Sequence, residues 1–164
     1  MDLLLVKRAQ KGDADAFVRL MEKYKLSLYK IAKSYLKNEE DIADAMQDAI
    51  LSAYEHIREL KQATYFKTWV TRILINRCCD LLKHQKRFIP TALEENQTAS
   101  APASDQAFYE LLEELPADMR PIFLLYYGEG FRTREIAQIL NLNENTVKSK
   151  LTRGRQKLKE SICC

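Results

Sequence analysis

Residues 133–159 read TREIAQILNLNENTVKSKLTRGRQKLK, and this stretch decides what kind of fold to expect. Apolar residues recur at helical spacing on both sides of the tight turn at 141–143, which predicts one helix over 133–140 and a second from residue 144 to about residue 159. Two helices joined by a tight turn have the layout of a helix-turn-helix, in which the second helix enters the major groove of DNA. The stretch therefore predicts a small helical DNA-binding unit.

The second of these helices separates into an apolar side, a polar side and two basic flanks. Val147, Leu151, Gly154 and Leu158 fall together on a helical wheel and are expected to face inward. Short hydrogen-bonding side chains lie on the opposite side, and cations line both flanks, with Lys150 and Lys157 on one flank. This arrangement suits DNA, in which base edges lie between two rows of phosphates. A helix that is merely soluble usually interleaves acids, and none occurs between 145 and 159. The candidates for DNA contact are Asn145, Thr146, Lys148, Ser149, Thr152, Arg153, Arg155 and Lys157.

The rest of the chain also predicts helices, so the expected fold class is all-α. With 4 Gly and 4 Pro in 164 residues, turn residues are too few for a sandwich or a barrel. Capping residues and apolar stripes predict a short helix near 3–10 and several longer ones. The expected helix starts are Asp13, Asn38, Thr64 and Asp118, and the expected stops are Pro116 and the pair Gly128 and Gly130.

Residues 89–105 are expected to join two small helical domains. They contain two prolines, small polar residues and three acids, with no basic residue and no apolar period, which is typical of a flexible linker. The predicted domains are residues 1–88 and residues 106–164, the second of which contains the helix-turn-helix.

The net charge of +3 conceals separate acidic and basic blocks. Residues 39–59 carry seven acids against one base, whereas residues 61–87 carry seven bases against one acid. From residue 132 to the end, eight bases stand against three acids. Basic blocks favour a polyanionic partner, and the acidic block favours a basic protein partner.

The sequence contains no pattern that indicates catalysis, a cofactor or a metal. Gly-rich phosphate loops, GxSxG and HExxH are absent, and acids are segregated from the basic surface that a nuclease would need beside them. The four cysteines form two adjacent pairs, Cys78 with Cys79 and Cys163 with Cys164, which lack metal-ligand spacing and are interpreted as small apolar residues and a ragged end. No apolar run approaches the roughly 18 residues of a membrane span, and the start lacks a signal-peptide pattern. We therefore expect a cytoplasmic protein that is not an enzyme and does not insert into a membrane.

Five segments spread along the chain can be compared with a known family. They are KGDADAF at 11–17, DIADAMQD at 41–48, FKTWVTRILIN at 66–76, LPADMR at 115–120 and NTVKSKLTRGR at 145–155. In this order they resemble the extracytoplasmic-function, or group IV, sigma factors of bacterial RNA polymerase, within the sigma-70 family. Ala45 stands where that family usually has a larger aliphatic residue. The resemblance covers nearly the whole chain.

The resemblance implies a transcription initiation factor that binds core RNA polymerase and directs it to promoters in response to stress. It implies that Asp44, Gln47 and Asp48 bind the clamp coiled coil of core polymerase, and that the flap is a further contact. It implies that Lys61, Lys67, Arg72 and Asn76 act at the minus-ten element, which the first domain recognises and melts. It also implies that the second domain reads the minus-thirty-five element through the DNA candidates named above, that the linker passes toward the RNA exit path, and that an anti-sigma factor is a partner.

Two questions remain open from the sequence alone. Trp69 and Phe66 could stack on melted bases, but both fall on the apolar stripe, which favours a place in the core. The alternative function is a stand-alone helix-turn-helix regulator whose N-terminal domain dimerises or binds a ligand. Such a regulator would bind duplex DNA without core polymerase.

Overall fold

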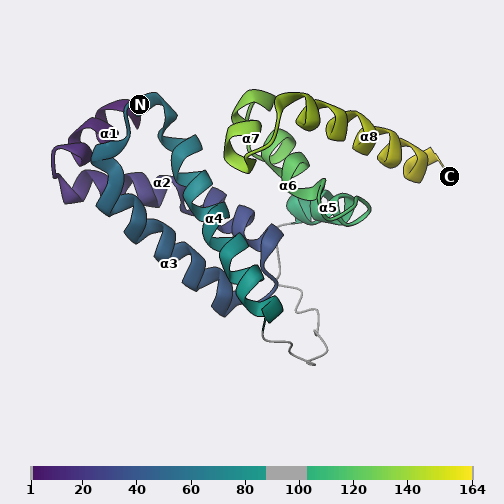
Figure 1. The fold of residues 1–164 in the computed structure, drawn as a ribbon, viewed down its shortest axis with the longest axis horizontal. Coiled ribbons are helices and arrows are strands. Elements are labelled where there is room, and N and C mark those ends of the chain that lie inside the picture. Colours follow the sequence, from purple (N-terminus) through teal and green to yellow (C-terminus); the bar gives the residue numbers. More distant parts are fainter. Residues whose placement is uncertain (1, 88–102, 164) are drawn as a thin grey trace. The chain divides into compact units, whose positions relative to one another are not determined.

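The computed structural model describes residues 2–87 and 103–163, and within these ranges it contains helices and turns but no strand. The chain divides into two compact units, Met1–Leu93 and Glu94–Cys164, which Figure 1 shows in purple to teal and in green to yellow. The all-α fold class expected from the sequence is confirmed. The linker predicted at 89–105 lies mostly outside the described residues, but its last three residues belong to a helix that begins at Ala103.

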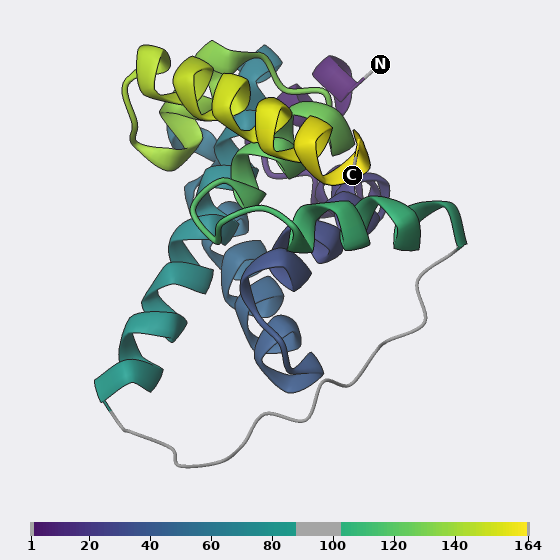
Figure 2. The same cartoon turned by 90° about the vertical axis from the view of Figure 1, so that its right-hand side faces the viewer.

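Over residues 2–87, the first unit contains four helices and two short 3-10 turns. Helices α3 and α4 lie side by side, and α2 packs against both of them (Figures 1 and 2). The turns η1 and η2 connect α3 to α4, and α1 contacts both turns. The bounds are α1 Asp2–Gln10, α2 Ala14–Tyr35, α3 Glu39–His56, η1 Ile57–Glu59, η2 Ala63–Tyr65 and α4 Phe66–Arg87.

Two helix starts in the first unit are fixed by the capping residues that the sequence predicted. The Asp13 carboxylate accepts a hydrogen bond from the Ala16 N–H at 3.2 Å, and the Asn38 side chain accepts from two backbone N–H groups at 2.8 and 3.1 Å. The Ala16 N–H, together with Arg8, holds the pKa of Asp13 below its usual range. The predicted start at Thr64 is wrong by two residues, because Ala63–Tyr65 forms the 3-10 turn η2 and α4 begins at Phe66.

The core of the first unit explains several residues that could have had a functional role. Phe66 is fully buried, as the apolar stripe predicted, and Trp69 lies beside it with a ring-centroid distance of 6.0 Å and is partly exposed. Cys78 is also buried, and burial raises the pKa of its thiol to about 12. A thiol with so high a pKa stays protonated and packs as a small apolar side chain, as expected. Cys164 lies outside the described residues.

The second unit contains the predicted helix-turn-helix. Helix α7 has the predicted bounds, and Asn141 adopts the left-handed conformation (φ 55°) that ends it. The longest helix of this unit, α8, is drawn in yellow in Figures 1 and 2 and packs against α6 and α7. The bounds are α5 Ala103–Glu113, α6 Arg120–Phe123, the π-helical turn η3 Leu124–Gly128, α7 Thr133–Leu140 and α8 Glu144–Cys163.

Two predictions about the helix ends in this unit are wrong. Helix α5, expected to run to Leu115 and stop at Pro116, ends at Glu113, because the N–H groups of Glu114 and Leu115 bond to carbonyls only three residues back. Asp118 does not cap α6, whose N-cap is Met119. The Asp118 carboxylate instead accepts a hydrogen bond from Lys150 of α8 at 2.7 Å, an ion pair that holds its pKa below the usual range.

Candidate nucleic-acid interface and neighbouring protein-binding surface

Helix α3 presents an exposed polar face that is separate from its buried side. Ala45 and Ala49 are fully buried, whereas Asp44, Gln47 and Asp48 are exposed and lie three and four residues apart on one face. The structure therefore brings together all three residues that were expected to bind core polymerase.

An apolar residue that was not predicted extends this face by one turn. Leu51 is 60% exposed and lies three residues after Asp48. An exposed leucine between acidic side chains gives a protein partner apolar area as well as charge. Its spacing contained the signal, because Leu51 falls outside the stripe of buried alanines in α3.

The segment between α3 and α4 forms a second exposed surface. Lys61 lies between the two 3-10 turns and is exposed. On α4, Arg72 and Asn76 are exposed and four residues apart, and Tyr65, at the end of η2, falls on the same side of the helix. Tyr65 is 49% exposed and was not singled out from the sequence, although an aromatic ring beside basic side chains is a platform on which a nucleic-acid base can stack.

Lys67 does not share the exposed face of α4 with Arg72 and Asn76. It lies four residues before Thr71, which is buried, so it falls on the side of α4 that packs against the rest of the unit. Lys67 is only partly exposed there. The sequence grouped it with the other basic residues by charge alone, and charge does not indicate which side of a helix a residue occupies.

Helix α8 has the wheel that the sequence predicted. Val147 and Leu151 are buried and Gly154 is buried with them, whereas Leu158 is partly exposed. Of the eight DNA candidates, Thr146 is partly exposed and the other seven are exposed. The helix therefore presents a continuous polar and basic surface from its first turn onward.

The first turns of α8 are held by hydrogen bonds within the helix-turn-helix. Thr133, at the start of α7, donates from its hydroxyl to the Glu144 carboxylate at 3.0 Å, and Lys148 forms an ion pair with the same carboxylate at 3.6 Å. The Thr152 hydroxyl donates to the carbonyl of Lys148 at 3.0 Å, which leaves its oxygen free to accept. Glu144 thus joins the two helices and orients Lys148 without burying it.

Arg155 has partners within the protein that the sequence did not reveal. Its Nε donates to the Tyr127 hydroxyl at 2.6 Å, and its guanidinium lies 5.6 and 5.7 Å from the ring centroids of Tyr126 and Tyr127. The hydrogen bond to Tyr127 raises the pKa of Arg155. The guanidinium has five N–H donors and Tyr127 uses one of them, so others can still contact a phosphate from the position that the tyrosines give it.

Lys150 forms an ion pair within the protein and is therefore less available to DNA than its place on the basic flank of α8 suggested. Its ion pair with Asp118 ties α8 to the turn before α6, and the lysine side chain is only 23% exposed. This flank therefore offers DNA the charge of Lys157 rather than that of both lysines.

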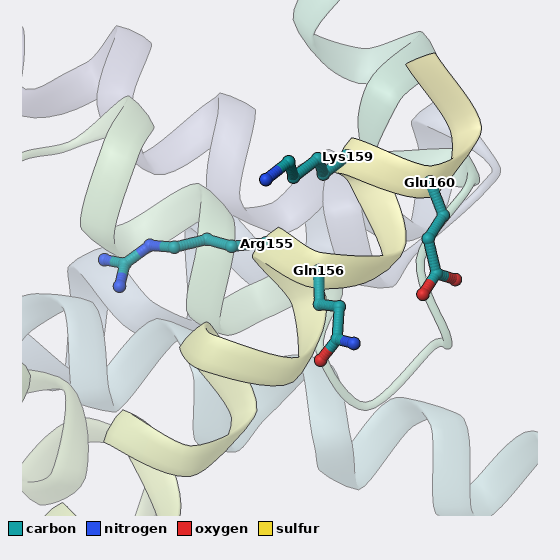
Figure 3. Close-up of a pocket in the computed structure, with 4 residues that line it drawn as sticks. All are labelled: Arg155, Gln156, Lys159 and Glu160. Carbon is teal, nitrogen blue, oxygen red and sulfur yellow. The ribbon is translucent and has the colours of Figure 1, made fainter. Parts of the chain in front are cut away.

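A shallow hollow lies along α8, lined by Arg155, Gln156, Lys159 and Glu160 (Figure 3). In Figure 3, the two cations extend to one side of the helix and the other two side chains to another. All four residues come from one helix, so the hollow is a groove on the surface and does not enclose a small molecule. Among residues 2–87 and 103–163, no three His, Cys, Asp or Glu side chains are grouped to hold a metal ion. None of the helices in those ranges is long and apolar enough to cross a membrane.

Comparison with known proteins relates the two units of the chain to a family. Residues 20–88 match the family model of sigma-70 region 2, and residues 105–158 match that of sigma-70 region 4. The ECF RNA polymerase sigma factor SigM of Mycobacterium tuberculosis is 31% identical over 152 residues, which cover 90% of this chain and 77% of that protein. The chain belongs to the ECF sigma factors of RNA polymerase. As a sigma factor, it is a transcription initiation factor that binds core RNA polymerase and directs it to specific promoters. Sigma factors are not enzymes.

Two solved structures are similar to this sigma factor. The sigma factor RpoE of Bartonella quintana, solved in complex with the anti-sigma factor NepR, has a similar fold (TM-score 0.70, 24% identity, 88% of this chain and 94% of that chain). An engineered region 2 of sigmaE, solved in complex with GTAAAA, is 31% identical with a TM-score of 0.51, and covers 54% of this chain and 93% of that one. The second match shows that a relative of the first unit binds a short DNA sequence.

Proposed function

We propose that the three surfaces of this sigma factor have separate roles in initiation. The exposed face of α3 binds core RNA polymerase, the segment from η1 into α4 acts at the minus-ten element, and α8 reads the minus-thirty-five element. The observation that supports this assignment is the segregation of charge. The exposed side of α3 carries acids, whereas the exposed side of α8 between residues 145 and 159 carries cations and no acid. We retain residues 1–88 and 106–164 as the two functional domains.

The acidic face of α3 suits a basic protein surface and is poorly suited to DNA. Asp44 and Asp48 repel phosphates, and Gln47 and Leu51 add a hydrogen-bonding group and apolar area beside them. We place the clamp coiled coil of core polymerase on this face, with Asp44, Gln47 and Asp48 as its contacts.

The minus-ten element is assigned to the loop and to the exposed side of α4. Lys61, Arg72 and Asn76 offer charge and hydrogen-bonding groups to an unpaired strand, and Tyr65 offers a ring on which a base can stack. Removing a base from the duplex stack costs a few kcal/mol, and stacking on a protein ring offsets part of this cost. Lys67 contributes at most from the edge of this surface.

The minus-thirty-five element is assigned to α8. Lys148, Ser149 and Thr152 lie near the N-terminal part of the helix, which is the part that reaches base edges in a helix-turn-helix. Lys157 lies further along the helix, where phosphate contact is expected instead. The remaining contacts that we propose are Asn145, Thr146, Arg153 and Arg155.

The partners of this sigma factor follow from the same assignment. It acts where core polymerase works, in the cytoplasm, and the flap of the polymerase is a second protein contact. Because a relative with the same fold was solved with an anti-sigma factor, we expect such a factor to bind this chain as well. The passage of the linker toward the RNA exit path concerns residues that lie mostly outside the described ranges.

The assignment is tested by reversing the charge of the α3 face. The variant with Asp44→Lys and Asp48→Lys is expected to lose co-purification with core polymerase and promoter-specific run-off transcription, while keeping its helical content. A matched control with Asp15→Lys and Glu22→Lys makes the same charge change at two exposed acids of α2. Binding of the α3 variant to core at the affinity of this control would show that the α3 face is only solvated.

A further inference from the structure

A hydrogen-bonded link joins the end of α1 to the loop that follows α3. Gln10 is the last residue of α1, and its side-chain amide donates to the Ile57 carbonyl at 3.0 Å and to the Leu60 carbonyl at 2.8 Å. The two acceptors lie 47 and 50 residues further along the chain. One side chain therefore connects the N-terminal helix to both ends of η1.

These two carbonyls lie where the backbone stops being helical. Carbonyl groups in the last turn of a helix lack their usual partner within that helix. The Ile57 carbonyl accepts one backbone hydrogen bond, from the Leu60 N–H at 3.2 Å, and a carbonyl oxygen can accept a second. Ile57 follows the last residue of α3, and Leu60 is the residue at which the chain leaves η1 in an extended conformation (ψ 112°). By binding both carbonyls, Gln10 fixes the direction in which the chain leaves α3.

A second contact between the same segments supports this arrangement. Gly12, in the turn after α1, has a φ of +100°, and a Cβ atom built on it would lie 3.4 Å from Nη2 of Arg58. The Arg58 side chain, which comes from η1, therefore lies close to the turn that follows α1. The turn and the loop approach each other at this second point.

The packing of α1 itself does not depend on Gln10. Val6 is fully buried, Ala9 is buried at 6% exposure, and Asp2 forms an ion pair with Lys23 and a hydrogen bond with Tyr24 at the other end of the helix. The contribution of Gln10 beyond this packing is its pair of hydrogen bonds to the loop.

We propose that Gln10 is a positioning residue for promoter recognition, which holds the 57–65 loop in the conformation that reads the minus-ten element. The inference rests on the proposed function, in which this loop recognises the minus-ten element. Loss of the hydrogen bonds lets the loop sample other conformations. Discrimination between minus-ten sequences falls, while binding to core polymerase through α3 stays unchanged.

The test compares three single variants in the full-length chain. Gln10→Glu has nearly the same shape but presents a carboxylate, which cannot donate to the carbonyls and repels them. Gln10→Lys restores a donor of similar reach and is the rescue variant. Lys23→Ala is the matched control, because it breaks the ion pair at the opposite end of α1 and leaves the loop contacts in place.

Two measurements separate positioning from general stability. Hydrogen exchange of the 57–65 backbone amides in the free chain is expected to accelerate in Gln10→Glu but not in Gln10→Lys or Lys23→Ala. With holoenzyme, the ratio of affinities for a cognate and a substituted minus-ten element is expected to fall about three- to tenfold in Gln10→Glu, the effect of losing one or two hydrogen bonds. Affinity for core polymerase is expected to stay at the wild-type value.

The outcomes also distinguish this inference from the proposed function. Lys61→Ala, within the loop, provides the comparison. If Lys61→Ala lowers minus-ten discrimination and Gln10→Glu does not, Gln10 has no positioning role and the inference is wrong. If exchange accelerates in Gln10→Glu but neither variant changes discrimination, Gln10 holds the loop and the loop does not read the minus-ten element. The proposed role of the loop is then wrong, and the role of Gln10 in promoter recognition falls with it. Equal loss of discrimination in Gln10→Glu and Lys23→Ala would reduce the effect to general destabilisation and also overturn the inference.

Discussion

Replacing Gly154 by alanine is expected to destabilise the second unit by about 1–2 kcal/mol, because the new methyl group would overlap the ring of Phe123 in α6. A Cβ atom at this position would lie 2.3 Å from Cε2 and 2.4 Å from Cζ of Phe123, and 3.5 Å from Cδ2 of Leu115. Carbon atoms in favourable contact are about 3.5–4.0 Å apart, so the ring or the helix must move. Phe123 is only 2% exposed and has little room to do so.

The magnitude is the difference between two opposing effects. Overpacking a core costs about 1–3 kcal/mol, and the short distances to a buried ring place this case in the upper half of that range. Alanine in place of glycine inside a helix contributes about 1 kcal/mol in the other direction. For a domain of this size, each kcal/mol of destabilisation lowers Tm by about 4–8 °C.

A double-mutant cycle with Phe123→Leu tests the explanation as well as the size of the effect. Phe123→Leu alone removes ring atoms and leaves a gap, so it should destabilise too. Together with Gly154→Ala, the new methyl group fills that gap, and the pair should be more stable than the sum of the single effects by about 1–3 kcal/mol.

The assay is urea unfolding of the full chain followed by two signals. Far-UV circular dichroism reports on both units, whereas the single tryptophan, Trp69, reports on the first unit only. The tryptophan transition should be the same in all four proteins of the cycle. The reasoning is refuted if Gly154→Ala is neutral or stabilising, or if the two substitutions combine additively.

Three further predictions concern other contacts. Tyr127→Phe keeps the ring beside Arg155 but removes the hydrogen bond, and it should weaken holoenzyme binding to all promoters by about two- to tenfold; a loss confined to certain minus-thirty-five sequences would contradict a phosphate role. The pKa of Asp13 is held low by the backbone N–H that it caps. Its contribution to stability is therefore present above the unfolded pKa of the carboxyl, about 4, and is lost as the pH falls through the folded pKa. The free energies of unfolding of Asp13→Asn and the wild type should differ above about pH 4 and converge as the pH falls further, whereas a constant difference at all pH values would contradict the cap. Lys148→Ala should lose about 1–3 kcal/mol of discrimination among minus-thirty-five sequences, whereas Lys157→Ala should weaken binding to all promoters alike and reduce its salt dependence. The measurement is the affinity of holoenzyme for a panel of promoters at several salt concentrations. A uniform loss in Lys148→Ala or a sequence-selective loss in Lys157→Ala would show that α8 enters the groove differently.

Features encoded within a few neighbouring residues could be predicted from the sequence. Asp13 and Asn38 cap helices because a short polar side chain there can reach N–H groups two or three residues ahead, which is a local property. The bounds of α7 and the buried side of α8 followed from the helical period in the same way. These signals do not depend on the rest of the fold.

Contacts between distant residues could not be predicted. Lys150 and Asp118 are 32 residues apart, and Arg155 and Tyr127 are 28 apart, with no local pattern to relate them. Both pairings depend on where α8 crosses the preceding helices, and they change which cations face the solvent. The sequence could find the basic helix, but it could not show that one of its lysines is engaged elsewhere.

In α8, the residues that pack against the rest of the unit are different from the residues that we propose contact DNA, and this affects how the protein can evolve. Val147, Leu151 and Gly154 hold the helix in place, whereas Asn145 and Ser149 are exposed and lie outside that packing. Substitutions at exposed positions usually change stability by less than about 0.5 kcal/mol. Exposed side chains that we propose face DNA, such as Ser149, can therefore be exchanged during evolution without loss of the fold. If α8 reads the minus-thirty-five element as proposed, a few such point mutations would change which promoters this sigma factor selects, as long as the buried side of the helix is kept.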